Sequence, residues 1–277
     1  MTGRVEGKVA FITGAARGQG RAHAVRLAAE GADIIAVDIC APIDSVPYPL
    51  ATEADLKETV RRVESLGRKI VASHADVRDF SALETAVSEG VAELGRLDIA
   101  VANAGITGAA PTDSLPVQSW QDMIDVNLTG VYHAAKVAIP HIRAGGNGGS
   151  IVLTSSALGI RAMPNLPHYV AAKTGVIGLM RAMALELAAD RIRVNTVNPS
   201  IADTLMVQNN AMYKLFVPHI ENPTREQAAE VFATLNPMPT PWVDAEDVTN
   251  AVLFLVSDEA RFVTGLEFKI DAGFCLA

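Results

Sequence analysis

Two side chains in the second half of the sequence have the types and the spacing for proton transfer. Tyr169 and Lys173 are four residues apart in a helical pattern that runs to Ala189, so they share one helix face. A phenol ordinarily titrates near pH 10. A nearby ammonium and a cationic ligand could together lower that pKa by about three units, which takes about 4 kcal/mol. The phenolate could then take the proton of an alcohol while a hydride leaves the same carbon.

Two polar residues upstream fit the same chemistry. Ser156 follows the apolar strand pattern of residues 150–154, where its hydroxyl could donate a hydrogen bond to the substrate oxygen. Asn127 lies in a helical stretch over residues 117–142. A buried asparagine needs partners, so it either bends this helix or belongs to a polar relay. Hydrolysis by Ser156 is disfavoured, because no G-x-S-x-G turn is present.

A glycine turn near the N-terminus could bind the cationic ligand. Residues 9–12 predict a buried strand, and Gly14, Gly18 and Gly20 then lead into a helical pattern over residues 22–30. Glycine permits a tight turn and a close backbone approach, and the N–H groups of a helix start favour phosphate. The turn therefore predicts a pyrophosphate site, although its spacing differs from the G-x-G-x-x-G fingerprint.

The kind of dinucleotide follows from Asp38. This acid ends the apolar pattern of residues 34–37 at the place where ribose hydroxyls would be held, and the alternative is a solvated strand end. Its carboxylate would repel the 2′-phosphate of NADP, whereas Arg17 would attract it. We expect the acid to decide, because Arg17 could simply be solvated. The expected ligand is NAD, whose oxidised nicotinamide would be the cation near Tyr169.

Strand and helix patterns alternate along the whole chain. Further helices are predicted over 53–66, 81–94 (with Ser81 as N-cap) and 244–256, and further strands over 69–74, 98–102, 193–197 and 266–270. At two strand ends, Asp76 and Val77 could hold the adenine edge, and Asn103, Ala104 and Gly105 could lie against the ligand, with Asn103 tying neighbouring strands. The alternation predicts an α/β fold, a single doubly wound Rossmann domain over 1–277 with a mainly parallel seven-stranded sheet flanked by helices.

Two segments depart from this alternation. Residues 39–52 form a loop with three prolines, longer than such connections usually are, and we expect an insertion that covers the cofactor. A surface elaboration without function is the alternative. Residues 203–241 are expected to form a substrate lid, or else an ordinary helical pair on the core. The lid prediction rests on its adaptable apolar side chains, which are Met206, Met212, Tyr213, Phe216 and Val217.

The opposite wall of a substrate site is expected from residues 157–167, where Met163 and Leu166 add apolar surface. Neither wall carries a basic cluster, which favours a secondary alcohol on an apolar or cyclic skeleton over a sugar phosphate. His168 would point away from Tyr169 on their helix, so we expect it to have a packing role.

Composition limits the partners. The net charge of −8 argues against a nucleic-acid surface. No apolar stretch could span a membrane and the N-terminus lacks a signal-peptide core, which together predict a cytoplasmic protein. Cys40 and Cys275 suggest neither a disulfide nor a metal site. The helix over 174–187 is apolar on more than one face, which predicts a homo-oligomer, a dimer or a tetramer with the tetramer favoured.

The order of these motifs resembles the short-chain dehydrogenase/reductase family over nearly the whole chain. The motifs that match are TGAARGQG, Asp38, the Asn-Ala-Gly of 103–105, Asn127, Ser156 and the YVAAK of 169–173. The resemblance implies that Ser156 orients the substrate, Tyr169 is the acid/base and Lys173 binds the nicotinamide ribose. It also implies that Asn127 holds a water that relays protons to Lys173. The NAD contacts that it implies are Gly14, Arg17, Gly18, Gln19, Gly20, Asp38, Ile39, Asp76, Val77, Asn103, Ala104, Gly105, Tyr169, Lys173, Pro199, Ile201 and Thr204.

TGAARGQG and the segment 39–52 are more narrowly similar to the carveol-dehydrogenase-like actinobacterial branch of this family. Some members of that branch are described as keeping NAD tightly bound and passing electrons to a separate redox partner, mycofactocin. An external redox carrier is therefore an expected partner. One departure is Ser200 after Pro199, where the family usually has glycine. Serine lacks the freedom of glycine at positive φ, so the loop toward Ile201 and Thr204 could take a different path.

The function expected from these residues is NAD-dependent interconversion of a secondary alcohol and a ketone. The expected substrate is apolar and cyclic, similar to a terpenoid or a steroid, and Tyr169 is the expected acid/base. Two other interpretations stay open, namely a non-catalytic dinucleotide-sensing scaffold and a dehydratase or epimerase on the same fold. The scaffold has no chemical need for Ser156, Tyr169 and Lys173 together, and the chain lacks the added length of a sugar-nucleotide domain.

Overall fold

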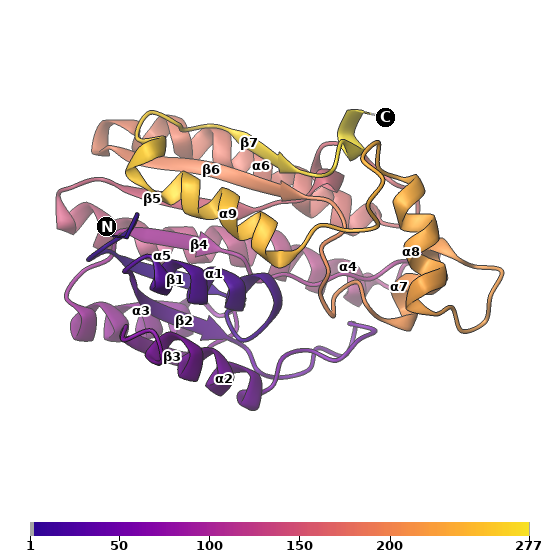
Figure 1. Ribbon diagram of the computed structural model, residues 1–277, viewed down its shortest axis with the longest axis horizontal. Coiled ribbons are helices and arrows are strands. Elements are labelled where there is room, and N and C mark those ends of the chain that lie inside the picture. The colour runs from indigo at the N-terminus through magenta and orange to yellow at the C-terminus, as the bar shows by residue number, and fades with distance from the viewer. Residues whose placement is uncertain (1–2, 277) are drawn as a thin grey trace.

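A computed structural model describes residues 3–276, and at its centre is a seven-stranded sheet whose neighbouring strands are all parallel (Figure 1). The strands are β1 (Val9–Thr13), β2 (Asp33–Asp38), β3 (Ile70–His74), β4 (Ile99–Ala102), β5 (Gly149–Thr154), β6 (Ile192–Pro199) and β7 (Glu267–Ile270). They lie in the order β3-β2-β1-β4-β5-β6-β7, so the strand order reverses between β1 and β4. This confirms the doubly wound Rossmann fold, in which ligands bind beyond the carboxyl ends of the strands at that reversal.

Helices cover both faces of the sheet. They are α1 (Gly18–Ala29), α2 (Glu53–Glu64), α3 (Phe80–Leu94), α4 (Val117–Ile124), α5 (Gly130–Gly145), α6 (Pro167–Leu187), α7 (Asn210–Phe216), α8 (Arg225–Thr234) and α9 (Ala245–Val256). One apolar core lies between the sheet and α1, α2 and α9, and the other lies between the sheet and α3, α5 and α6. Ala10 and Ile12 belong to the first core and Val9 and Phe11 to the second, because successive side chains of a strand point to opposite faces.

Helix starts differ from the sequence prediction where a backbone or capping feature decides them. Helix α1 already begins at Gly18, so the glycine turn itself supplies the first helical N–H groups. Helix α3 is capped by Asp79, not by Ser81, and the Asp79 carboxylate accepts a hydrogen bond of 3.0 Å from the Ala82 N–H. A carboxylate such as that of Asp79 is a stronger hydrogen-bond acceptor than the hydroxyl of Ser81.

The predicted helical stretch over 117–142 is one interrupted helix. Helix α4 passes into a π-helical turn, Asp125–Thr129, and α5 then continues to Gly145. Asn127 lies within this turn and is fully buried. A π turn inserts an extra residue into the helical ladder, so the structure confirms that Asn127 belongs to a helix irregularity.

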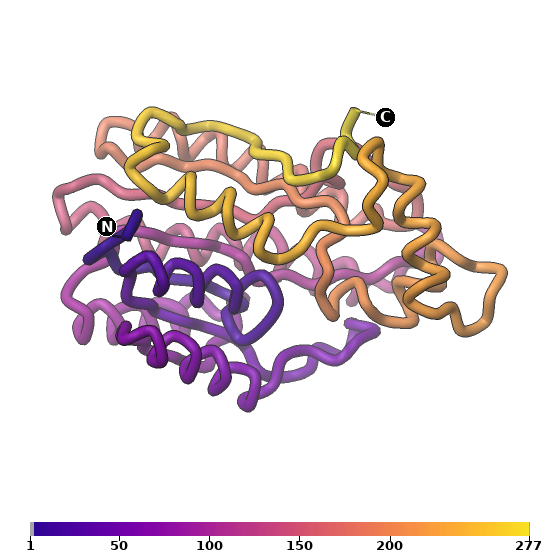
Figure 2. The backbone as a smooth tube through the Cα atoms, in the orientation of Figure 1, coloured from indigo at the N-terminus to yellow at the C-terminus, as the bar shows by residue number. Residues whose placement is uncertain are grey.

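The two segments that break the alternation lie at the same end of the sheet (Figure 2). Residues 39–52 contain no helix or strand, and they run from the end of β2 to the start of α2. Residues 203–241 include α7 and α8, which share a small apolar cluster centred on Tyr213, Ala228 and Phe232. The structure thus has two added walls beyond the carboxyl ends of the strands, at the end of the sheet where a ligand would bind.

Within residues 3–276, no helix is long and apolar enough to cross a membrane. The same part of the chain holds no group of three or more His, Cys, Asp or Glu side chains that could bind a metal ion. Cys40 and Cys275 are both free thiols.

Candidate active site

A cavity of about 600 Å³ opens at the carboxyl ends of the strands, next to the reversal of strand order. Seventeen of the predicted catalytic and NAD-binding residues line it, which are Gly14, Arg17, Gly18, Gln19, Asp38, Ile39, Asp76, Val77, Asn103, Ala104, Gly105, Ser156, Tyr169, Lys173, Pro199, Ile201 and Thr204. Gly20 and Asn127 do not line the cavity. The fold therefore gathers side chains from the whole length of the chain at one place.

The glycine turn is shaped for a close backbone approach. Gly14 has a φ of +67°, and a Cβ there would lie 2.9 Å from the Cα of Ala104. A Cβ at Gly20 would lie 2.0 Å from the carbonyl oxygen of Gly14, so Gly20 closes the turn from behind. The side-chain oxygen of Gln19 is buried and has no hydrogen-bond partner. These features fit a bound pyrophosphate, because the helix start presents its N–H groups to the cavity.

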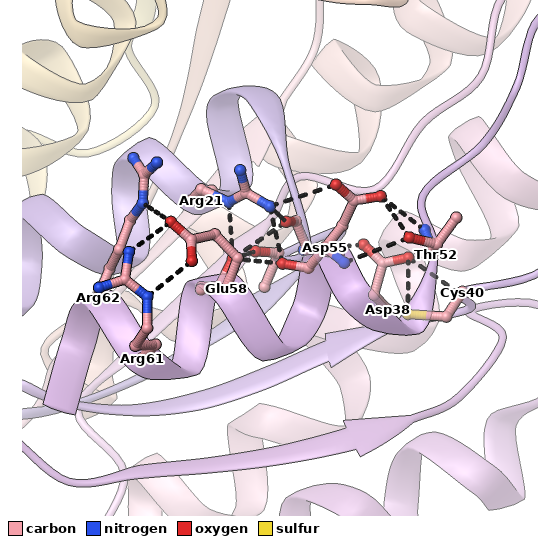
Figure 3. A network of polar contacts seen from close by, with 11 residues as sticks. Arg21, Asp38, Cys40, Thr52, Asp55, Glu58, Arg61 and Arg62 are labelled. Atoms are coloured by element: carbon pink, nitrogen blue, oxygen red, sulfur yellow. Dashed lines mark hydrogen bonds and ion pairs between the residues drawn. The ribbon is translucent and has the colours of Figure 1, made fainter.

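The carboxylate of Asp38 is fixed at the end of β2. It accepts hydrogen bonds from the backbone N–H groups of Ala16, at 3.0 Å, and of Cys40, at 3.1 Å. Figure 3 shows Asp38 close to Thr52 and Asp55, where the 39–52 segment joins α2. A carboxylate that is 7% exposed and aimed at the cavity edge fits ribose hydroxyls and opposes a 2′-phosphate.

Arg17 and Arg21, the two arginines of the glycine turn, are both engaged by the protein. Arg17 donates a hydrogen bond to the carbonyl oxygen of Pro49, so it is tied to the 39–52 segment and is not simply solvated. Arg21 donates to the carbonyl oxygen of Asp55 at 2.7 Å and also pairs with the Asp55 carboxylate at 3.5 Å (Figure 3). Burial lowers the pKa of Arg21.

The strand ends around the middle of the cavity are joined by polar bonds. The side-chain amide of Asn103 donates to the carbonyl oxygen of Thr13 at 3.1 Å, which confirms that Asn103 ties β4 to β1. Asp76 accepts hydrogen bonds from both the backbone and the guanidinium of Arg78. Val77 is buried beside Gly130.

Ser156, Tyr169 and Lys173 converge at the other end of the cavity. Ser156 is the N-cap of a short 3-10 turn (Ala157–Gly159) directly after β5, and its hydroxyl accepts a hydrogen bond from the Leu158 N–H at 3.1 Å. The ammonium of Lys173 donates to the carbonyl oxygen of Thr154 at 2.8 Å and lies 5.7 Å from the centre of the Tyr169 ring. The strand end and the first turns of α6 therefore bring the three groups together.

The protein's own groups do not acidify the phenol. Burial raises the pKa of Tyr169, and the neighbouring Ser156 hydroxyl lowers it without cancelling that effect. Burial also lowers the pKa of Lys173 to about 8. In the protein without ligand, desolvation of the phenolate is the larger effect. The predicted lowering of the pKa by Lys173 together with an oxidised nicotinamide stays a prediction.

Asn127 lies behind the wall of the cavity and is bonded to the backbone of Ile106. Its side chain accepts from the N–H of Ile106 and donates to the carbonyl oxygen of Ile106, each at 2.8 Å. A Cβ at Gly105 would lie 3.3 Å from the Asn127 side-chain oxygen and 3.6 Å from the Lys173 ammonium. Asn127 and Lys173 therefore face the same glycine.

The loop after β6 accommodates serine without strain. The N–H of Ser200 donates to the carbonyl oxygen of Ile270 at 3.1 Å. Among the described residues other than glycine, positive φ occurs at Cys40, Asn165, Arg191 and Ala272. Since Ser200 is not among them, its position does not require the conformational freedom of glycine. The loop then brings Thr204 to the glycine turn, where a Cβ at Gly18 would lie 3.4 Å from the Thr204 methyl carbon.

Among the aromatic residues of the cavity that sequence analysis missed are Tyr48 and Phe274. Tyr48 is 6% exposed, and its hydroxyl accepts a hydrogen bond from the Thr107 N–H at 3.1 Å. Phe274 reaches the cavity from the C-terminal turn. Neither residue belongs to a spacing pattern, since each is placed by contacts between distant segments. His168 is buried and does not line the cavity, as its predicted packing role requires.

Comparisons with known proteins agree with this geometry. A family profile described as enoyl-(acyl carrier protein) reductase matches residues 14–275. The chain is 54% identical over 271 residues to (-)-trans-carveol dehydrogenase of Rhodococcus erythropolis, and the match covers 98% of each chain. It is 56% identical over 275 residues to a short-chain type dehydrogenase/reductase of Mycolicibacterium smegmatis, with 99% of each chain covered. The chain belongs to the short-chain dehydrogenase/reductase family.

A solved structure extends the comparison. The crystal structure of carveol dehydrogenase from Mycobacterium avium in complex with NAD has a TM-score of 0.98 and 57% sequence identity, with 100% of both chains covered. The family and the narrower similarity to carveol dehydrogenases, both predicted from the sequence, are therefore confirmed. This short-chain dehydrogenase/reductase is an oxidoreductase. The link to mycofactocin stays a prediction.

Proposed function

We propose that this enzyme uses NAD to interconvert a secondary alcohol and a ketone on an apolar, cyclic skeleton of the terpenoid or steroid kind. The observation that supports this most strongly is the convergence of Ser156, Tyr169 and Lys173 at one end of a cavity whose other end is the glycine turn. Either half alone would be ambiguous. Together they provide a proton acceptor next to a dinucleotide site.

The described residues fit NAD. Gly14, Gly18 and Gly20 leave the turn open to a pyrophosphate, and the carboxylate of Asp38 lies at the end of β2 where ribose hydroxyls are held. Arg17 does not argue for NADP, because its guanidinium is bonded to the Pro49 carbonyl. The similar carveol dehydrogenase of known structure is itself a complex with NAD.

The chain's own residues supply the proton chemistry, and bound NAD supplies a hydride acceptor. Ser156 donates a hydrogen bond to the substrate oxygen, and Tyr169 takes the hydroxyl proton of the alcohol onto its phenolate oxygen. In the reverse direction the Tyr169 hydroxyl returns that proton to the ketone oxygen. Lys173 keeps positive charge beside the phenolate and, anchored on the Thr154 carbonyl, is positioned for the ribose.

Asn127 is proposed to serve proton exchange indirectly. Both of its amide atoms are bonded to the backbone of Ile106, and its oxygen shares the space around Gly105 with the Lys173 ammonium. It therefore holds the loop after β4 at the position where a water could connect Lys173 to the solvent. The π turn is what aims the Asn127 amide toward that loop.

The substrate class follows from the walls of the cavity. Met163 and Leu166 line one side, and Met212 and Phe216 of the 203–241 lid line the other. Apolar walls bind apolar ring systems. Arg225 of the lid also lines the cavity, but its guanidinium is paired with the Asp203 carboxylate at 2.7 Å. The name of the relative from Rhodococcus erythropolis refers to carveol, a cyclic alcohol. We therefore assign residues 203–241 to the substrate side.

The 39–52 insertion is proposed to cover NAD. Tyr48, Ile43 and Leu50 line the cavity, and three hydrogen bonds tie the segment to the rest of the protein. A cover of this kind would slow exchange of the nucleotide, so that electrons leave through an external redox carrier, for which mycofactocin is the proposed example. The proposed location is the cytoplasm.

We further propose a homo-oligomer, with a tetramer favoured over a dimer. The apolar helix α6 carries Leu185 with 83% of its surface exposed, and Trp120 on α4 is also exposed. These side chains would be covered by a second copy of the chain. Light scattering would show a single monomeric mass if this proposal is wrong.

The variant Tyr169→Phe tests the proposed function. It removes the proton acceptor and leaves the packing of the ring, so we expect the rate of alcohol oxidation to fall by about 10²–10⁴-fold while nucleotide binding is retained. The matched control is Tyr132→Phe, the same change on the exposed face of α5. Undiminished oxidation by folded, nucleotide-bound Tyr169→Phe protein would contradict the proposal.

A further inference from the structure

We propose that Phe274 is the end wall of the substrate part of the cavity and sets the size of the ring system that the enzyme accepts. We assign Arg161 as the residue that positions it. This inference rests on the proposed function and deepens it by naming a specificity residue. Neither residue belongs to the motifs of the sequence analysis.

Phe274 lies at the substrate end of the cavity. It begins a short 3-10 turn (Phe274–Leu276) after β7, is 5% exposed and lines the cavity. The next residue, Cys275, places its sulfur 3.6 Å from the carbonyl oxygen of Ala157, which directly follows Ser156. The turn is therefore next to the segment that holds the substrate-orienting hydroxyl, and far in the sheet order from Asp38 on β2.

Hydrogen bonds between backbone N–H groups and one carboxylate fix the turn that carries Phe274. The Asp271 carboxylate accepts hydrogen bonds from the N–H groups of Gly273 and Cys275, each at 3.0 Å. Ala272 and Gly273 both have a positive φ, of 48° and 86°. A residue with a side chain is uncommon in that conformation, so the surrounding contacts must fix the turn.

Both walls of the substrate site hold this turn between them. On the lid side, the N–H of Met238 donates to the carbonyl oxygen of Ala272 at 3.1 Å, and a Cβ at Gly273 would meet Pro237 at 3.0 Å. Figure 1 shows the C-terminal turn next to the chain that leaves α8. On the opposite side lie Ala157 and Arg161. Phe274 thus closes the gap between the two walls.

Arg161 fixes the ring of Phe274 through two contacts. Its guanidinium donates a hydrogen bond of 2.6 Å to the carbonyl oxygen of Phe274, and its central carbon lies 4.7 Å from the centre of the ring. A planar guanidinium can stack on an aromatic face and bond a carbonyl at the same time. Because Arg161 belongs to the wall over residues 157–167, it sets how far the ring reaches toward the substrate.

The variant Phe274→Ala tests the assignment with a panel of secondary alcohols of graded size, from cyclohexanol through a monoterpenoid alcohol to a steroid alcohol. Removal of the ring lengthens the cavity, so the ratio of kcat/KM for the steroid to kcat/KM for cyclohexanol should rise by about tenfold or more. For cyclohexanol, KM should rise with kcat nearly unchanged, because the ring binds ground state and transition state alike.

Control and companion variants separate this effect from a general disturbance. Leu276→Ala changes the same turn at a side chain that is 81% exposed, and the size ratio should stay at the wild-type value. Phe274→Trp fills the cavity further and should shift the ratio in the opposite direction. If Phe274→Ala does not fold, Phe274→Leu and Phe274→Trp still decide the question through opposite shifts.

The positioning role of Arg161 has its own readout. Arg161→Ala should move the size ratio in the same direction as Phe274→Ala, and the double variant should move it no further, because the two residues act as one unit. Arg161→Lys retains a cation and a donor and should restore most of the wild-type ratio. A double variant with additive shifts would overturn the positioning role.

Failure of this inference can be told apart from failure of the proposed function. If the wild-type protein oxidises several alcohols and Phe274→Ala, Phe274→Leu and Phe274→Trp all keep the wild-type size ratio, Phe274 is not the end wall. If the wild-type protein oxidises none of them, the proposed function itself is wrong. The ketones that correspond to the alcohols of the panel then provide a second readout, because each bound ketone protects the protein against thermal unfolding. The ratio of protection by the steroid ketone to protection by cyclohexanone is a size ratio without turnover. An unchanged ratio in the Phe274 variants would overturn the inference.

Discussion

The two added segments close the cavity in different ways. Residues 39–52 have no regular structure, and side-chain hydrogen bonds hold them to the rest of the protein. Arg17 donates to the Pro49 carbonyl, the Tyr48 hydroxyl accepts from the Thr107 N–H, and Ser45 donates to Asp122 at 2.7 Å. Each contact has a defined partner and geometry, so this wall is fixed in position.

The lid over residues 203–241 is instead a small packed unit. Helices α7 and α8 bury Tyr213, Ala228 and Phe232 between them, and the ring of Phe232 meets Phe216 edge-on at 4.9 Å. A short bridge between Ala202 and Val243 joins the two ends of the lid to each other. Hydrogen bonds also stabilise this unit, such as those from Arg225 to Asp203 at 2.7 Å and from Tyr213 to Gln208 at 2.6 Å. Its apolar contacts are not directional, which supports the proposal that the lid fits substrates of different shapes.

This difference supports the proposal that the cofactor side is specific for one ligand, whereas the substrate side accepts a class of ligands. A buried polar group without a partner costs free energy. The hydrogen bonds of the 39–52 segment therefore favour the one conformation in which all of these groups are paired. An apolar wall loses little when a methyl group is added or moved. A variant on the cofactor side should change nucleotide binding and leave KM for the alcohol nearly unchanged. A variant on the substrate side should change KM for the alcohol and leave nucleotide binding nearly unchanged.

The largest effect is expected for Asp38→Ala. The substitution removes the acceptor for two buried N–H groups and the charge that opposes a 2′-phosphate. Since a hydrogen bond to a charged group contributes about 1.5–3 kcal/mol, the preference for NAD over NADP should fall by roughly 10–100-fold. Competition binding of the two nucleotides measures this preference. Asp44→Ala, an exposed acid of the same segment, should leave it unchanged.

An intermediate effect is expected for Tyr48→Phe. The ring stays in place, but the Thr107 N–H loses its hydrogen-bond acceptor. This loss should destabilise the position of the 39–52 segment over the cavity by about 1–3 kcal/mol. Nucleotide release should therefore become about tenfold faster, as followed by stopped-flow fluorescence, whereas KM for the alcohol should change little. Tyr132→Phe is the control. Equal release rates for the two variants would show that the Tyr48 contact does not hold the cover.

The smallest effect is expected for Met212→Ala on the lid. Met212 lines the cavity, and its loss removes apolar contact that binds the ground state and the transition state equally. KM for an apolar alcohol should rise a few-fold with kcat and nucleotide release unchanged. Met212→Leu should restore the wild-type KM, and Lys214→Ala, an exposed change on the same helix, should not alter it. A faster nucleotide release in Met212→Ala would erase the distinction between the two walls.

The sequence predicted the sheet and the gathering of polar residues well, for a physical reason. Buried parallel strands such as Val9–Thr13 consist of nearly uninterrupted apolar residues, and their carboxyl ends must meet at one edge. Asp38 is the last residue of β2, Gly14 directly follows β1, and Ser156 lies two residues after the end of β5. Their convergence could therefore be expected without any knowledge of side-chain contacts.

The features that the sequence could not predict depend on contacts between distant segments. Tyr48 and Thr107 meet across the cavity, and Phe274 is held by Arg161 from another part of the chain. The sequence analysis also chose the wrong capping residue for one helix. Asp79 rather than Ser81 caps α3.

The burial of Tyr169 is a further feature that the sequence could not predict. The spacing of Tyr169 and Lys173 shows that the two side chains share a face, but it does not show how deeply the phenol is buried. Burial raises the pKa of Tyr169 more than the neighbouring groups lower it. We therefore expect the proposed activation of Tyr169 to require the bound cationic nicotinamide.

Above all, we propose that a cover held by side-chain hydrogen bonds closes the NAD site, while the substrate side remains open to exchange. The most direct test is to purify the protein without added nucleotide, denature it, identify and count what is released, and assay cyclic alcohols with added NAD or with an artificial dye acceptor. We expect NAD in an amount equal to the protein and turnover with the dye alone. Nucleotide-free protein that turns over only with added NAD, with ordinary saturation, would contradict the claim.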